Sequence, residues 1–277
     1  MQSDAIFPDT SRQAGKRGWS IPRRPAMLRR MQRKTLIAAH RGGVFLWPEN
    51  SATAFRNAAL LALEQAECDV HLTADGEAVV MHDATLDRMT DGRGPVSALG
   101  EAQFAALRVR GTAGEAPPTL AQYLAILAGS PVAPRIEIKA DAGHRPYPGI
   151  VGKTLAALDA AGQRQRAWII GFQAGTMAEA QRAGGLAGVA WLLETPTLRD
   201  LGLPGLVATA RAHGFPEVGM HESAIDAELV AALRASGIGI GTWGANHAPS
   251  IRRMLELGVD IFATDDPPLA IRMRDVA

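Results

Sequence analysis

The sequence contains few cysteines and few aromatic residues, and its positive and negative charges nearly balance. Its 277 residues include a single cysteine, Cys68, which excludes a framework of internal disulfide bonds and favours a reducing compartment. The net charge is +1, so the chain as a whole has no field that would attract nucleic acid or an anionic membrane. No apolar run reaches the roughly 20 residues of a transmembrane helix. These absences predict a cytoplasmic protein without a transmembrane segment.

The first 34 residues differ in composition from the rest. They are basic, contain several prolines and include two arginine pairs, Arg23-Arg24 and Arg29-Arg30. A twin-arginine export signal needs a continuous apolar segment after the pair, whereas the segment TLIAAHRGG that follows carries charge almost at once. We expect a basic arm, residues 1–34, that extends from the surface or contacts a partner subunit or an anionic surface. A single aromatic residue, Trp19, lies among its basic residues, so nucleic acid is not an expected partner.

From Leu36 onward, short apolar segments alternate with alanine-rich stretches of helical character. The expected strands are 35–40, 67–73, 77–82, 134–139, 167–172, 188–194, 217–221, 237–243 and 260–265. The expected helices are 51–65, 119–129, 149–162, 174–185, 226–237 and 248–258. This alternation, with 47 % hydrophobic residues, predicts that residues 35–277 form one α/β domain, a (β/α)₈ TIM barrel. An open doubly wound sheet is the alternative, but there is no G-x-x-x-x-G-K motif, and the G-x-G-x-x-G match at Gly239 to Gly244 lies in the expected strand 237–243 and does not open a helix.

One connection between strands is too short for a helix. Only Ala-Asp-Gly separates the expected strands at 67–73 and 77–82, and Asp-Gly between alternating segments indicates a β-hairpin with a two-residue turn. With Asp75-Gly76 as the turn, Asp69 would lie opposite His82. Opposed residues have Cβ atoms about 4.5–5.5 Å apart, so this register would place a carboxylate beside an imidazole.

Two carboxylates lie two residues apart in the expected strand 67–73. Glu67 and Asp69 therefore point to the same side, while Cys68 and Val70 point to the other. Carboxylates on one face repel each other unless a proton or a cation lies between them, and oxygen ligands suit Mg²⁺ or Ca²⁺. The alternative is that both carboxylates pair with surface lysines or arginines.

The segment PRIEIK repeats this arrangement, because Glu137 and Lys139 share one face. Charged residues in a strand suited to burial need a partner or a metal, and residues near strand ends in a barrel face its mouth. His40 and His82 end two further strands, and histidine titrates near neutrality as a general acid or base. Arg41 follows His40 and offers a planar fork suited to phosphate. A single histidine at a strand end is more often structural or exposed, but two of them, with three acidic and two cationic residues at comparable strand positions, indicate a functional site.

These segments, taken in order, resemble a known enzyme family. The motifs are HRG and PEN, then ECDVHLTADGEAVVMHDATLDRMTDGRGPV, then PTLAQYL and IEIK, and finally GTWGANHAPSIRRMLELGVDIFATDDP. They resemble those of the glycerophosphodiester phosphodiesterases over about Leu36 to Pro268, and the segment from Glu67 to Val96 is the most specific. The basic arm has no counterpart in this pattern.

The resemblance implies a TIM barrel that hydrolyses glycerophosphodiesters to glycerol 3-phosphate and an alcohol. The residues that it implicates are Glu67, Asp69 and Glu137 as ligands of one Mg²⁺ or Ca²⁺; His40 and His82 as the acid/base pair; Arg41 and Lys139 as phosphate contacts; Glu49 as support of the first loop; and Trp243 and Phe172 as pocket walls. The nucleophile, water or the glycerol 2-hydroxyl, stays open, as do the role of each histidine, the preferred alcohol and the oligomeric state.

The sequence departs from the family pattern at the rim of the pocket. The family's WTVN reads WGAN here, and its Ser-Phe-Asp reads Gly171-Phe172-Gln173. The segment after Val96 is too short for the capping insertion of some members, which suggests an open, permissive pocket. Two alternative functions remain: lysophospholipase D-type cleavage of lysophospholipids, and a non-catalytic barrel that binds phosphate. Phe45 and Trp47 of the first loop are expected either to cap the rim or to line the entrance to the alcohol site.

Overall fold

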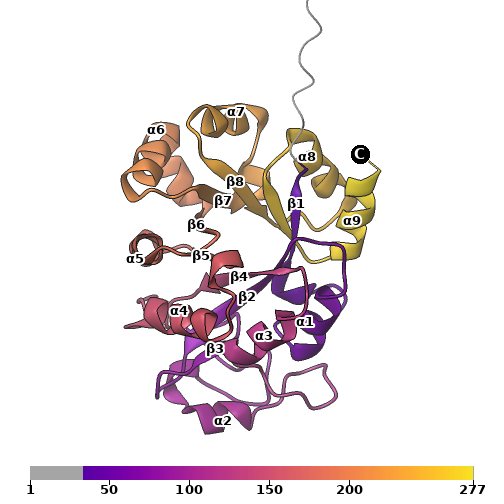
Figure 1. Ribbon diagram of the computed structural model, residues 1–277, viewed down its shortest axis with the longest axis vertical. Helices are drawn as coiled ribbons and strands as arrows, with labels where there is room; N and C mark the ends of the chain where they lie inside the picture. The colour runs from indigo at the N-terminus through magenta and orange to yellow at the C-terminus, as the bar shows by residue number, and fades with distance from the viewer. Residues whose placement is uncertain (1–33, 277) are drawn as a thin grey trace, which may run out of the picture. The chain divides into compact units, whose positions relative to one another are not determined.

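A parallel β-barrel forms the centre of the molecule in a computed structural model, which describes residues 34–276 (Figure 1). Its eight strands run in the order β1-β9-β8-β7-β6-β5-β4-β2, and pairing of β1 with β2 closes the barrel. Strand β3 adds to β2 outside this ring in the antiparallel sense. The predicted TIM barrel is therefore confirmed. The expected basic arm, residues 1–34, lies outside the described residues except for Lys34.

The strands and helices have the following bounds. The strands are β1 (Leu36–Ala39), β2 (Gln65–Leu72), β3 (Ala78–Val80), β4 (Ala133–Ile138), β5 (Trp168–Gly171), β6 (Gly188–Leu193), β7 (Glu217–His221), β8 (Gly239–Trp243) and β9 (Ile261–Thr264). The α-helices are α1 (Ala52–Ala58), α2 (Glu101–Ala105), α3 (Leu120–Leu127), α4 (Ile150–Ala160), α5 (Ala174–Ala183), α6 (Thr195–His213), α7 (Ala227–Ala235), α8 (Ala248–Leu257) and α9 (Pro267–Asp275).

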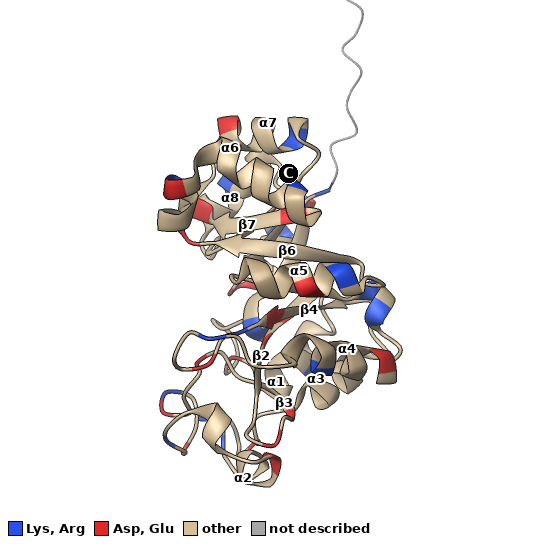
Figure 2. Ribbon diagram, turned by 90° about the vertical axis from the view of Figure 1, so that its left-hand side faces the viewer, with Lys and Arg blue, Asp and Glu red and all other residues tan. Residues whose placement is uncertain are grey.

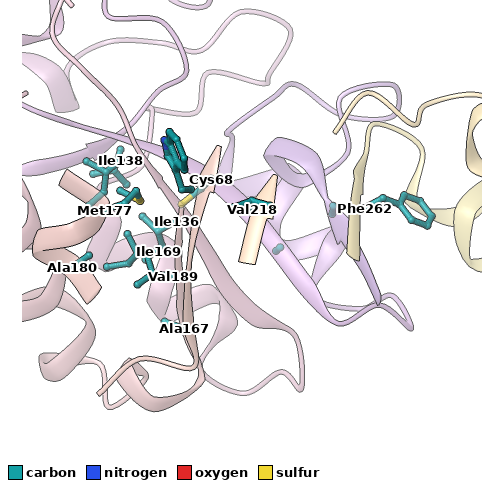
Figure 3. Close-up of a cluster of buried hydrophobic side chains, with 14 of the residues drawn as sticks. Cys68, Ile136, Ile138, Ala167, Ile169, Met177, Ala180, Val189, Val218 and Phe262 are labelled. Atoms are coloured by element: carbon teal, nitrogen blue, oxygen red, sulfur yellow. The ribbon is translucent and has the colours of Figure 1, made fainter. Parts of the chain in front are cut away.

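The main hydrophobic core lies between the strands and the helices that surround them. Cys68, Ile136 and Ile169 come from three neighbouring strands and belong to one buried cluster, to which α5 contributes Met177 (Figure 3). Successive side chains of a strand point to opposite faces, so the residues that alternate with Cys68, Ile136 and Ile169 along their strands face the barrel interior. In β2 and β4 these alternate positions carry charge, so the sequence places polar groups inside the barrel and apolar groups against the helices.

The hairpin after β2 is present, but its predicted register is wrong by one residue. Val70 pairs with Val80, and the Met81 amide donates to the Asp69 carbonyl at 3.0 Å, so Asp69 lies opposite Met81 and not His82. The turn has three residues, with Gly76 at φ +84°, the left-handed conformation that completes such a loop. Asp-Gly fits a two-residue or a three-residue turn. The Thr73 side chain, which accepts from the Glu77 amide at 2.9 Å, selects the longer one.

Residues 73–118 form a small extension, here called the hairpin lobe. It contains β3 and α2 and lies at one end of the view in Figure 1. A separate cluster of buried side chains, among them Val79, Leu86 and Phe104, packs inside it. The lobe is inserted between β2 and α3, the helix that leads into the next parallel strand β4, and it carries His82.

One predicted helix differs markedly from the structure, and three helices, α2, α6 and α9, were not predicted. The helix expected at 51–65 ends at Ala58, because the chain must turn to enter β2 at Gln65. Among the unpredicted helices, α6 contains Pro204 and a non-helical Gly202 at φ +59°. Both residues disfavour a helix in a local pattern, so tertiary packing decides the conformation. No helix among residues 34–276 is long and apolar enough to cross a membrane.

A buried ion pair lies inside the barrel near the amino ends of its strands. Arg135 Nη2 donates to Glu217 Oε1 at 2.6 Å and Nη1 donates to Gln65 Oε1 at 3.1 Å. Arg135 also lies over the ring of Trp168, with 5.5 Å between Cζ and the ring centroid. Both charged residues are 4 % exposed, so each charge depends on the other for compensation.

We expect Glu217→Gln to lower the free energy of unfolding by about 3 kcal/mol, because it leaves the Arg135 charge buried without its counterion. The double variant Arg135→Met/Glu217→Leu should lose less than this single variant, since it buries no charge. Denaturant unfolding of the three proteins tests this order, with Asp200→Asn of the exposed Arg199–Asp200 pair as a control without effect. A double variant less stable than Glu217→Gln would contradict the prediction.

Candidate active site

Three carboxylates meet inside the barrel near the carboxyl ends of β2 and β4. Asp69 and Glu137 are directly paired positions on the two strands, and Glu67 lies one side-chain repeat earlier on β2. Each of the three offers an oxygen within 4.8 Å of the other two, and all three residues are buried. The structure therefore brings together the three residues that the sequence indicates as metal ligands.

The cluster is held by cationic and amide donors. Lys139 Nζ lies 2.9 Å from Asp69 Oδ1 and 2.6 Å from Glu137 Oε1, and Asn50 Nδ2 donates to Asp69 Oδ2 at 2.8 Å. The Arg41 amide donates to Glu67 Oε2 at 2.8 Å, while Glu67 Oε1 is buried without a hydrogen-bond partner among the described residues. An all-oxygen donor set with one unpartnered carboxylate oxygen fits a hard divalent cation.

Without a cation, the pKa values of Glu67 and Asp69 are shifted in opposite directions. Burial, and then the negative charge of Asp69, raise the pKa of Glu67 to about 8. Burial alone would also raise the pKa of Asp69, but the positive charges of Lys139, His82 and Arg41 outweigh it and lower that pKa below its ordinary value. Metal-free protein at neutral pH therefore holds a proton on Glu67.

His40 follows β1 and is oriented by a carboxylate from the other end of the sequence. Its Nδ1 donates at 2.6 Å to Oδ1 of Asp265, the residue that follows β9. Asn246 Nδ2 donates to Asp265 Oδ2 at 2.6 Å, and the Asp265 amide donates back to Asn246 Oδ1 at 2.9 Å. Burial lowers the pKa of His40, but the Asp265 hydrogen bond and the charge of Glu67 raise it above its ordinary value overall.

His82 is held in the same manner, through both its ring and its backbone. Its Nδ1 donates to Asp83 Oδ1 at 2.7 Å, and its carbonyl accepts from His71 Nε2 at 3.1 Å. Burial lowers the pKa of His71 to about 4, so this histidine is neutral at pH 7 and its Nδ1 accepts from the Tyr147 hydroxyl at 3.0 Å. In both His40 and His82, only Nε2 is left for a substrate.

The first loop contains two strained residues that serve the cluster. Arg41 and Asn50 have φ values of +49° and +55°, a left-handed conformation that is costly for residues other than glycine. Arg41 Nε lies 3.5 Å from Asp69 Oδ2, and its Nη1 lies 3.3 Å from both oxygens of Glu49. Glu49 thus anchors the Arg41 guanidinium within the first loop.

A cavity of about 300 Å³ opens beside these groups. His40, Arg41, His82 and Lys139 line one side together with the carboxylates Glu67 and Glu137. Ile170, Phe172, Leu192 and Trp243 line the other, with Phe172 and Trp243 in edge-to-face contact at 5.4 Å between centroids. In Figure 2 the strand β6 is drawn without charged residues, whereas charge is visible about β4. The cavity is therefore lined by charge mainly from β1, β2 and β4 and by apolar groups mainly from β5, β6 and β8, with Glu194 after β6 as a charged exception.

The exposed part of the first loop lies outside this lining. Phe45 is 51 % exposed, and its ring lies 5.5 Å from that of His247. Trp47 packs over the backbone at Gly43. Neither aromatic residue belongs to the cavity lining, so the structure favours the rim over the entrance to the alcohol site for both.

Several site residues were missed by sequence reasoning. They are the partners of the predicted residues: Asp265, Asn246, Asp83, Arg88, Asn50 and His71. Asp83 and Asn50 each adjoin a predicted residue in the quoted motifs, so adjacency was the available signal. The pairing of Asp265 with His40 spans 225 residues and has no local signature.

Comparison with known proteins decides the family. Residues 40–269 match the model of the glycerophosphoryl diester phosphodiesterase family. The chain belongs to this family. A glycerophosphodiester phosphodiesterase of Caldanaerobacter subterraneus is 29 % identical over 245 residues, which are 87 % of this chain and 98 % of that protein. Membership makes the protein a glycerophosphodiester phosphodiesterase, an enzyme of the phosphoric diester hydrolase class.

Solved structures agree with this assignment. A protein of Agrobacterium tumefaciens assigned to the same family superposes with a TM-score of 0.85 at 36 % identity, covering 87 % of this chain and 98 % of that one. A phosphodiesterase of Oleispira antarctica, solved with the product sn-glycerol-3-phosphate, superposes with a TM-score of 0.74 at 20 % identity, covering 87 % and 97 %. At that identity the second likeness shows the shared fold.

The shifted pKa of Glu67 predicts the pH dependence of stability in metal-free protein. The folded state keeps a proton that the unfolded state releases above its ordinary pKa of 4.5, so the free energy of unfolding should fall as pH rises from 4.5 to about 8. Asp69 does not act in this window, because its pKa is shifted downward. The difference in free energy of unfolding between wild type and Glu67→Gln, measured by denaturant unfolding in EDTA, should show this decline, because the amide of the variant releases no proton. Parallel curves would contradict the prediction.

Proposed function

We propose that this phosphodiesterase hydrolyses glycerophosphodiesters to glycerol 3-phosphate and an alcohol, with His40 and His82 as its acid/base pair and a divalent cation as cofactor. The observation that carries the proposal is one cavity lined by two histidines, each with Nδ1 held by a carboxylate, beside three clustered carboxylates. The sn-glycerol-3-phosphate in the Oleispira antarctica structure supports the choice of product.

The two histidines move protons through their Nε2 atoms. One Nε2 takes the proton of the attacking hydroxyl, and the other gives a proton to the oxygen of the leaving alcohol. The attacking group is water or the glycerol 2-hydroxyl, and the second choice gives a cyclic phosphate that water then opens. Asp265 and Asp83 fix the tautomers, because a carboxylate accepts a hydrogen bond and so requires a proton on Nδ1.

Glu67, Asp69 and Glu137 would hold Mg²⁺ or Ca²⁺. Such a cation supplies positive charge that stabilises the negative charge growing on the phosphate oxygens. Arg41 and Lys139 line the same side of the cavity and add charge to that effect. Lys139 bridges two of the carboxylates, so its charge also lowers their mutual repulsion.

Phe172 and Trp243 form the apolar wall against which the carbon skeleton of the substrate packs. This wall is short, and the exposed Phe45 and Leu46 lie in the first loop, outside the cavity lining. The arrangement favours a small glycerophosphodiester over the long acyl chain of a lysophospholipid. The retained acid/base pair favours an enzyme over a non-catalytic phosphate-binding barrel. The cytoplasmic location remains a prediction from the single cysteine.

We expect glycerophosphocholine and glycerophosphoethanolamine to be cleaved with Mg²⁺ or Ca²⁺, and cleavage to stop in EDTA. His40→Ala and His82→Ala should each lower kcat by about 10²- to 10⁴-fold, because a positioned acid or base contributes that much. Product analysis by mass spectrometry should find glycerol 3-phosphate. His213→Ala, on the exposed end of α6, serves as a histidine control with normal activity.

Each alternative gives a different result in the same assay. Activity that rises with acyl-chain length on lysophospholipids would favour lysophospholipase D-type cleavage. Binding of metal and phosphate without turnover of any diester would favour the non-catalytic barrel. Full activity in EDTA, or in Glu67→Ala, would overturn the metal assignment.

Asp265→Asn should lower kcat by about 100-fold, because the amide can donate to Nδ1 and so favours the wrong tautomer of His40. The neighbouring Asp266→Asn is the matched control. Asp266 caps α9 by accepting from the Leu269 amide at 3.0 Å, and asparagine caps a helix equally well. Steady-state kinetics of the two variants measure the difference. Equal activities would show that Asp265 does not orient His40.

A further inference from the structure

The Arg88 guanidinium contacts two carboxylates, Asp83 and Glu49, that lie next to the candidate site. Its Nε lies 2.6 Å from Asp83 Oδ2 and its Nη2 lies 3.0 Å from Asp83 Oδ1. The same guanidinium reaches Glu49, with Nη2 at 2.6 Å from Oε1 and Nη1 at 3.1 Å from Oε2. All three guanidinium nitrogens are therefore engaged, each by at least one carboxylate oxygen.

Each of these carboxylates holds a residue that lines the cavity. Asp83 accepts from the His82 ring, and Glu49 accepts from Arg41. Asp83, Glu49 and Arg88 are themselves outside the cavity lining. Arg88 is thus one step removed from both a proton-transfer group and a phosphate contact.

We propose that Arg88 is a positioning residue that orients the His82 imidazole through Asp83 and the Arg41 guanidinium through Glu49. This role rests on the proposed function, since it assigns tasks to His82 and Arg41. It also connects the hairpin lobe, which carries His82 and Arg88, to the first loop of the barrel, which carries Arg41 and Glu49.

The geometry requires arginine at this position. A guanidinium presents its donors in a rigid planar fork, so it can face two carboxylates at once and keep both in one plane. A lysine ammonium is a point charge that can stay near both carboxylates without fixing their orientation. Charge alone is therefore retained in Arg88→Lys, and orientation is lost.

The charges of the network explain what the loss of Arg88 does. Glu49 is buried and receives hydrogen bonds from two arginines, and those from Arg88 include the shorter one, 2.6 Å against 3.3 Å from Arg41. Without Arg88, Glu49 keeps Arg41 as its remaining cationic partner and draws it away from the phosphate. Asp83 loses its counterion, and its carboxylate is free to rotate away from Nδ1 of His82.

Steady-state kinetics on glycerophosphocholine test the proposal. Arg88→Ala should lower kcat by about 10- to 100-fold, as loss of a group that orients a functional histidine does, and should raise KM. Arg88→Lys should recover KM more than kcat, because it restores charge but not the fork. Arg93→Ala, at an exposed arginine of the same lobe, is the matched control and should behave as wild type.

Two readouts separate positioning from a merely structural role. Guanidinium chloride, at concentrations far below those that unfold the protein, should restore part of the activity of Arg88→Ala, because the side chain is 46 % exposed and leaves an accessible space. Guanidinium chloride should not raise the activity of Arg93→Ala. In wild type, its effect on activity should not exceed that of sodium chloride. In an Asp83→Ala background, Arg88→Ala should lower activity less than it does in wild type, because only the contact of Arg88 with Glu49 is left to lose. Comparing Arg88→Ala/Glu49→Gln with Glu49→Gln gives the corresponding loss through Asp83.

The ¹⁵N signals of the His82 ring keep the proposal testable if no substrate is turned over. The Nδ1–H signal, assigned by its loss in His82→Gln, should shift or broaden in Arg88→Ala and stay unchanged in Arg93→Ala. An inactive wild type with this shift would refute the proposed function and leave the positioning role intact. Normal kcat in Arg88→Ala, or an unchanged His82 spectrum in a folded Arg88→Lys, would overturn the role of Arg88.

Discussion

The mutual repulsion of three buried carboxylates is the constraint on which the rest of this structure depends. Glu67, Asp69 and Glu137 lie within reach of one ion and are buried, so water screens them little. An isolated charge in such a place is prohibitively costly, so each carboxylate needs a donor, a proton or a cation. Lys139, Asn50 and the backbone of the first loop supply the donors, and the strained conformations of that loop follow from this need.

The two histidines show a second level of organisation. His40 depends on Asp265 from the last barrel strand, and His82 depends on Asp83 from the hairpin lobe. One support thus comes from closure of the barrel and the other from an extension outside it. The site forms only when both parts are in place, and Ala78 and Val80 of β3 belong to the main hydrophobic core, so the lobe is packed against the barrel as well.

Sequence reasoning reaches as far as local patterns reach. Alternation along β2 and β4 indicates which side chains share a face within each strand, and the family resemblance adds that the carboxylates of the two strands meet. The hairpin register failed because Asp75-Gly76 fits two turn lengths, and the Thr73 side chain decides between them. Asp265 and Arg88 could not be found, because their partners are set by tertiary contacts. Helix α6 was missed because packing overrides the local effect of Gly202 and Pro204.

The place of the hairpin lobe has an evolutionary consequence. The chain leaves the barrel after β2 and returns to α3 and β4, while the ring of eight strands closes without the lobe. Insertions and deletions in the part of the lobe beyond Arg88 can therefore accumulate without breaking a barrel strand. Because His82 lies at the base of the lobe, such length changes alter the surroundings of this histidine while the carboxylate cluster stays fixed. Substrate range can diverge in this lineage at a single loop, with the chemistry unchanged.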